Sequence, residues 1–173
     1  MLDFLKRQGD TPEVLPVELY APVDGQLIPM TAVNDEAFSH KMIGDGFAVN
    51  PTAQQVHSPV SGTILCVFPK KHAITLRTNS GLEVMVHMGL HTVELDGAPF
   101  TIHVMEGQEV QHGTLLAEMD LEQLKQAGKD PIVIVCITSM DRVEDLSTAD
   151  PVRVHANEIV GHADVQAEKP TGA

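Results

Sequence analysis

The chain has 173 residues, 43% of them hydrophobic, which is enough for one well-filled core and too little for two ordinary domains. Twenty-four acidic residues against eleven basic ones give a formal charge of −13, which argues against nucleic acid and favours a basic-faced protein partner. No stretch approaches the ~20 apolar residues of a membrane span and no signal peptide is present, so we expect a cytoplasmic protein.

Three regions are expected along the chain. A flexible segment covers residues 1–16, one domain covers 17–162, and a disordered polar tail covers 163–173. The first seven residues combine apolar with basic side chains, so this end is either a loose tail or a short amphipathic turn with weak membrane contact. The starting methionine and the polar tail favour a free-standing protein over a piece of a larger one.

The fold class expected is all-β. Thirteen glycines and eleven prolines separate many short apolar runs, a pattern typical of an antiparallel β-sandwich or barrel-sandwich hybrid with one or two short helices. Turn residues such as those at 44–46 and 79–81 divide the runs. The expected strands are 17–20, 26–30, 47–50, 62–68, 73–78, 82–88, 92–95, 100–105, 115–119, 132–138, 152–154 and 158–160.

One helix stands out after Asp120. This residue can cap the helix, Gln123 occupies the third helical position, and Gly128 closes the segment before Pro131. The helix is short and is expected to pack on a sheet edge.

A weak internal repeat links two parts of the chain. The segment APVDG at 21–25 is echoed by SPVSG at 58–62, and each leads into an apolar run. Glycine spacing over 107–116 matches the turns of barrel-sandwich hybrid folds, the architecture of lipoyl and biotinyl domains. We interpret these features as duplicated hairpin units, although any glycine-rich β protein can show such spacing.

Two of the nine histidines lie where they could act together. His87 interrupts the apolar run 84–88, and Gly89 follows it without a side chain to block approach. His72 begins the preceding strand, so a hairpin closed at 79–81 would bring both histidines to the same end. A lone histidine in an apolar strand is most often a hydrogen-bonded core residue, but the pairing favours a reactive site.

Two facing imidazoles suit phosphoryl transfer. A neutral ring nitrogen is a nucleophile, and the second ring can hydrogen-bond the phosphoryl oxygens without a cofactor. An apolar rim would keep water from the labile phosphorus–nitrogen bond. His72 and His87 would also form half of a zinc site, so a zinc ion shared with a partner is compatible with the pair but not obligatory.

The segment GLEVMVHMGLHTV at 81–93 resembles the active-site signature of the glucose-type enzyme IIA family of the bacterial phosphoenolpyruvate-dependent sugar phosphotransferase system. PVDGQLI, SPVSGTILCVFPKKHAI and DPIVIVCITSMD agree with this family in the same order, and the resemblance covers about residues 19–160. It implies a β-sandwich phosphotransferase component that takes a phosphoryl group from the carrier protein HPr on His87, at Nε2. By the same resemblance His72 stabilises that group, and the acceptor is a cysteine of a sugar-specific IIB/IIC permease.

Two residues depart from the family pattern, and three others are candidate docking residues. Lys70 replaces the usual Thr two residues before the first histidine, and either points to solvent, which we favour, or attracts the phosphoryl oxygens. His91 replaces the usual Asp and offers a third imidazole that would strengthen metal capture or sensitise transfer to pH. Asp35, Phe38 and Asp141 fall where the family surrounds its active-site face, with turn and strand-edge roles as the alternative.

Three other functions stay open at this point. A zinc metallopeptidase would use His87 and His91, but Met88 stands where its catalytic Glu belongs. A carrier acylated on Lys41 would need that lysine at a hairpin tip. A regulatory module of the same fold would bind transporters or enzymes according to its phosphorylation state. The sugar is not readable from these residues, and a monomer is the default.

Overall fold

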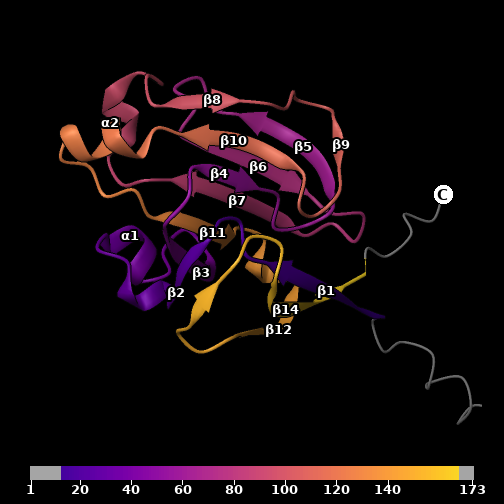
Figure 1. Ribbon diagram of the computed structural model, residues 1–173. Coiled ribbons are helices and arrows are strands. Elements are labelled where there is room, and N and C mark those ends of the chain that lie inside the picture. The colour runs from indigo at the N-terminus through magenta and orange to yellow at the C-terminus, as the bar shows by residue number, and fades with distance from the viewer. Residues whose placement is uncertain (1–12, 168–173) are drawn as a thin grey trace, which may run out of the picture.

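The computed structural model describes residues 13–167, which form three antiparallel sheets (Figure 1). The large sheet has the order β13 (Arg153–Val154), β2 (Gly25–Pro29), β3 (Asp45–Pro51), β11 (Val133–Ile137), β7 (Glu83–Met88), β6 (Ala73–Arg77), β5 (Gly62–Val67) and β9 (Glu109–Val110). The second contains β4 (Gln55–His57), β10 (Leu115–Met119) and β8 (Phe100–Ile102). The third contains β1 (Val14–Tyr20), β14 (Ile159–Gln166) and β12 (Val143–Thr148).

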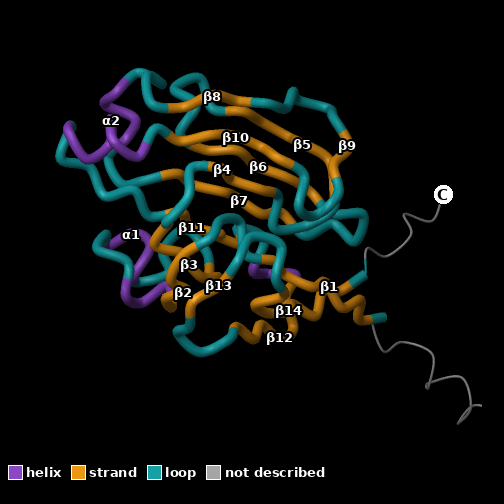
Figure 2. The backbone as a smooth tube through the Cα atoms, viewed as in Figure 1, coloured by secondary structure: helices purple, strands orange, loops and turns teal. Residues whose placement is uncertain are grey.

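Helical segments are short and join or flank the strands (Figure 2). The α-helices are α1 (Glu36–Ser39) and α2 (Leu121–Gln126), and the 3-10 helices are η1 (Met30–Ala32), η2 (Thr92–Leu95) and η3 (Met140–Arg142). Helix α2 forms as predicted, because the Asp120 carboxylate accepts a hydrogen bond from the Gln123 amide at 3.0 Å. None of the helices in the described part of the chain is long and apolar enough to cross a bilayer.

The large sheet is buried on both faces at its centre. On β7, Val86 and Met88 belong to the larger core cluster between the sheets, whereas Met85 belongs to a smaller cluster. Successive side chains of a strand point to opposite faces, so His87 shares the face of Met85. Phe38 of α1 lies in that smaller cluster too. The pleat of β7 therefore directs His87 toward α1 and not into the main core.

Burial of Cys136 illustrates how tightly this part of the sheet is packed. The residue is fully buried on β11, and both it and Cys66 are free thiols. Burial, followed by the charge of Asp45, raises the pKa of Cys136 to about 12. The thiol therefore stays protonated and acts as a small apolar side chain.

Several sequence-based boundaries are wrong in the middle of the chain. The expected strand at 92–95 is the helix η2, because His91 (φ 57°) and Asp96 (φ 52°) adopt left-handed conformations at its two ends and prevent an extended chain. Strand β8 stops at Ile102, short of the expected limit. The short elements α1, β4, β9 and β12 were not predicted, because each lacks a strong apolar run.

Strand structure also extends beyond the domain limits expected from sequence. Strands β1 and β14 pair from Val14 opposite Gln166 inward, so parts of the segments 1–16 and 163–173 are ordered. Ala163 and Val165 are fully buried, which gives β14 an apolar face that the polar composition of the tail obscures. The predicted lipid-contacting turn lies outside the described residues.

A paired-histidine candidate active site

The β6–β7 hairpin brings His72 and His87 together as predicted. Ala73 lies opposite His87 in the strand register, and the Met88 amide donates a hydrogen bond to the His72 carbonyl at 2.8 Å. The two imidazole rings have their centroids 5.3 Å apart and lie nearly perpendicular, at 81°. Both rings thus meet at the end of the hairpin opposite its turn.

Gly89 has a structural role that differs from the one expected. Its φ of 76° lies in the left-handed region, and a Cβ added there would lie 2.4 Å from Cγ2 of Thr92. The Thr92 hydroxyl donates a 2.6 Å hydrogen bond to the Met88 carbonyl. The missing side chain of Gly89 therefore lets the chain turn tightly against Thr92 and does not open a path to His87.

Two aromatic rings brace the histidines in a small pocket. The ring of Phe38 contacts His87 with centroids 5.1 Å apart, and the ring of Phe68 contacts His72 at 5.4 Å. The pocket has a volume of about 180 Å³. Its lining residues are Asp35, Phe38, His72, His87, Leu90, His91, Thr92 and Val93. Phe68, Leu90, Thr92 and Val93 were not singled out from sequence, although three of them lie within the signature segment.

The ring nitrogens of the two histidines have unequal access. Nδ1 of His72 and Nδ1 of His87 are both buried. Both side chains nevertheless keep partial exposure. Nε2 is therefore the nitrogen of each ring that can face an incoming group.

Burial keeps both imidazoles neutral at physiological pH. The pKa of His87 is lowered to about 4, first by burial and then by the charge of His72, while the Gly89 backbone and Asp35 oppose the shift. Burial also lowers the pKa of His72. Each ring thus offers an unprotonated nitrogen, which is what a nucleophile requires.

Comparison with known proteins agrees with this geometry. Residues 17–143 match the family model described as phosphoenolpyruvate-dependent sugar phosphotransferase system, EIIA 1. The chain belongs to this EIIA family. EIIA components are phosphotransferases with a phosphohistidine intermediate, so the chain is a phosphotransferase component with the role of a phosphocarrier.

Two relatives of this EIIA chain illustrate the match. The glucose-specific EIICBA component of Streptococcus pneumoniae is 46% identical over 129 residues, which cover 75% of this chain and 18% of that protein. The solved structure of glucose permease IIA from Mycoplasma capricolum matches with a TM-score of 0.76 and 35% identity, covering 86% of this chain and 96% of that one. The antiparallel β-sandwich expected from sequence is thereby confirmed.

The two departures from the EIIA pattern have different environments. The Lys70 side chain is exposed, as favoured from sequence; its ammonium forms a 2.5 Å ion pair with Asp96 and does not line the pocket. Because both partners are exposed, the pair adds little stability. His91 does line the pocket, where its charge slightly lowers the pKa of His87.

Among the candidate docking residues, Asp35 and Phe38 lie at the pocket and Asp141 does not. The Asp35 carboxylate caps α1 by accepting hydrogen bonds from the amides of Ala37 and Phe38, which sets Phe38 against His87. Asp141 lies on η3, beyond the far end of β11. There the neighbouring residue Arg142 bonds the Gly81 carbonyl near the hairpin turn.

The rival chemistries gain no support from this arrangement. Within residues 13–167, His91 does not complete a closely spaced group of three metal-binding side chains with His72 and His87, as a metallopeptidase site would need. Lys41 follows α1, and its ammonium lies 3.2 Å from Asp45, so it is not displayed at a hairpin tip. The EIIA family is not known to need a cofactor.

Proposed function

We propose that this EIIA chain accepts a phosphoryl group from phospho-HPr on Nε2 of His87 and passes it to the cysteine of a sugar-specific IIB domain. The observation that carries the proposal is the neutral, half-buried His87, which lines the pocket beside His72 with its Nδ1 enclosed, so Nε2 is the nitrogen left to react. The names of the two relatives favour a glucose-type IIB/IIC permease as the acceptor. Such transfer takes place in the cytoplasm.

In the first step the Nε2 lone pair of His87 attacks the phosphorus of phospho-HPr. The new phosphorus–nitrogen bond forms as the donor's bond breaks, and the donor imidazole leaves with the bonding electron pair. A neutral His72 can donate a hydrogen bond from Nε2 to the phosphoryl oxygens as charge builds on them. In the second step a cysteine thiolate attacks the phosphorus and His87 departs as neutral imidazole.

Apolar side chains around the pocket serve docking and water exclusion. Leu90 and Phe38 are buried in its wall, and Val93 at its edge is exposed. Met42, which follows α1, is 74% exposed and Ile43 is also exposed. A partner that covers these side chains would keep water from the phosphohistidine during transfer. Zinc is not needed for either step, and a zinc ion on His72 and His87 would require further ligands from the partner.

The test is phosphorylation by phosphoenolpyruvate, enzyme I and HPr, followed by intact mass and acid lability. We expect one acid-labile phosphate on the wild type, on His72→Gln and on a control variant, His155→Gln, in which an exposed histidine outside the pocket is replaced. His87→Ala should take up none, because it lacks the nucleophile. His72→Gln should then transfer the group to a IIB domain more slowly than the wild type.

A folded wild type that takes up no phosphate would contradict carriage. The same fold acting only as a regulatory binding module would then become the better explanation. Phosphate retained by His87→Ala would instead contradict the assignment of the residue while leaving carriage intact.

A further inference from the structure

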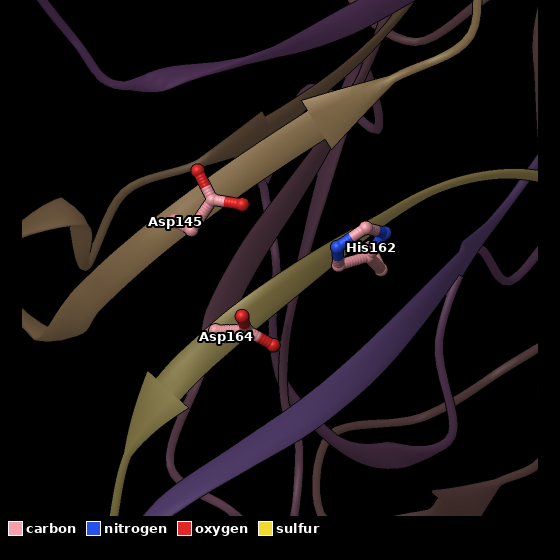
Figure 3. A group of neighbouring side chains, drawn as sticks. All are labelled: Asp145, His162 and Asp164. Carbon is pink, nitrogen blue, oxygen red and sulfur yellow. The ribbon is translucent and has the colours of Figure 1, made fainter.

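Three side chains of metal-ligating types gather on the third sheet (Figure 3). His87 lies on β7 of the large sheet. Asp145 comes from β12, and His162 and Asp164 come from β14, with one ligand atom of each within 4.8 Å of the other two. A ring nitrogen of His162 is turned toward the two carboxylates (Figure 3). We propose that this group binds a divalent transition-metal ion.

Strand pairing fixes the three side chains on one face. Asp145 lies directly opposite Asp164 in the β12–β14 register, and His162 precedes Asp164 by two residues. Residues two apart on a strand share a face. The intervening Ala163 and the following Val165 are fully buried, so they define the inner face. The proposed ligands therefore project from the outer face of a backbone held by the core.

The group concentrates negative charge, because two carboxylates lie directly opposite each other. Like charges directly opposite in a strand pair are destabilising. Within the described part of the chain, neither Asp145 nor Asp164 forms an ion pair with a lysine or arginine. Glu18 on β1 lies opposite His162 and adds a third carboxylate nearby. A bound divalent cation would turn this repulsion into a link between β12 and β14.

The mixture of ligands selects the class of metal. One imidazole and two carboxylates suit Zn²⁺, Mn²⁺, Co²⁺ or Ni²⁺, whereas Ca²⁺ and Mg²⁺ prefer oxygen ligands alone. The Ser147 hydroxyl lies 2.9 Å from Nδ1 of His162 and restricts rotation of the ring. Nε2 of His162 has no partner among the described residues. Three protein ligands leave the remaining coordination positions to water.

Metal-dependent stability of the 173-residue chain tests this site, because the effect of removing Asp145 on the melting temperature should reverse when Zn²⁺ is added. The parent protein for this test carries His72→Gln and His87→Gln. In EDTA, adding Asp145→Asn should leave it at least as stable as this parent, because the change removes one of two opposed negative charges. With added Zn²⁺ the melting temperature of the parent should rise above that of Asp145→Asn. Asp150→Asn removes an exposed carboxylate outside the group, and it should respond to Zn²⁺ as the parent does.

Calorimetric titration with Zn²⁺ completes the test. The parent should carry His72→Gln and His87→Gln, so that the phosphocarrier pair cannot bind the ion, with the wild type measured alongside. We expect Asp145→Asn and His162→Gln each to weaken the affinity by about 10-fold or more. Absence of Zn²⁺ binding by this parent, or binding unchanged in both variants, would overturn the proposal. Phosphate uptake by the wild-type pair is measured separately, so neither result affects the proposed carrier function.

Discussion

Burial of His87 has two effects: it keeps the imidazole neutral and reactive, and it makes the stability of the fold depend on pH. The ring lies against Phe38 and beside His72, and its pKa falls to about 4 because the charged form loses hydration. An unfolded chain returns the imidazole to water, where its pKa is about 6.5. The neutral nucleophile at pH 7 is therefore linked to a native state that resists protonation.

This linkage predicts a stability that falls with acid. Below about pH 6.5 His87 binds a proton in the unfolded state, whereas in the folded state it stays neutral until about pH 4. The free energy of unfolding therefore decreases as pH falls through this window. Between pH 7 and pH 5 the cost from His87 should be about 2 kcal/mol. Urea unfolding of the wild type and of His87→Gln at both pH values measures it. An equal loss in the two proteins would show that His87 is not the group responsible.

The element that shapes the site is the tight connection from β7 into η2. Gly89, with its positive φ, directs the chain so that Leu90, His91 and Val93 line the pocket. Thr92 fills the space beside Gly89 and bonds the end of β7. This packing fixes the wall of the pocket relative to His87.

Replacing Gly89 should therefore disturb the site as well as the fold. In Gly89→Ala the new Cβ would meet Thr92 and the Asp130 carbonyl in a left-handed backbone, so we expect a loss of roughly 2 kcal/mol or more. Gly107→Ala is the matched control, because its φ is also positive but no atom lies within 4 Å of the added Cβ. Unfolding free energies compare the two, and an equal cost in both would refute the packing argument.

How far sequence predicts these elements depends on how local their causes are. The β6–β7 hairpin was predictable, since its turn residues and the apolar alternation around His87 are local signals. The cap of α2 by Asp120 was local too. Helix η2 was not predictable, because non-glycine residues such as His91 and Asp96 adopt positive φ only under tertiary constraint. The position of Asp141 depends on where β11 ends relative to β7, which no single segment specifies.

At the scale of the whole molecule, the two ends of the described chain stabilise each other. Strand β14 lies between β1 and β12, and its Val160, Ala163 and Val165 belong to the main core cluster. The third sheet therefore depends on Ala163 and Val165, which lie in the segment that was predicted from its polar composition to be disordered. Two buried apolar residues among polar neighbours are a weak signal until a partner strand is known, which is why the sequence pattern of β14 did not predict a strand of this length.

Truncation distinguishes the contribution of β14 from that of the residues beyond it. A chain that ends at His162 loses the second half of β14, including Ala163 and Val165, and should be destabilised by several kcal/mol through lost core burial. A chain that ends at Ala167 keeps β14 intact and is the control. Thermal unfolding of both distinguishes them, and equal melting temperatures would show that the pairing of β14 contributes little.

The proposed carrier function places the phosphoryl group on Nε2 of His87. The most direct measurement is phosphorus–nitrogen coupled NMR of the phosphorylated protein labelled with ¹⁵N-histidine, with His72→Gln used to assign the signals. We predict a single phosphohistidine whose phosphorus couples to Nε2 of His87, because Nδ1 is buried. Coupling to Nδ1, or to a histidine other than His87, would contradict it.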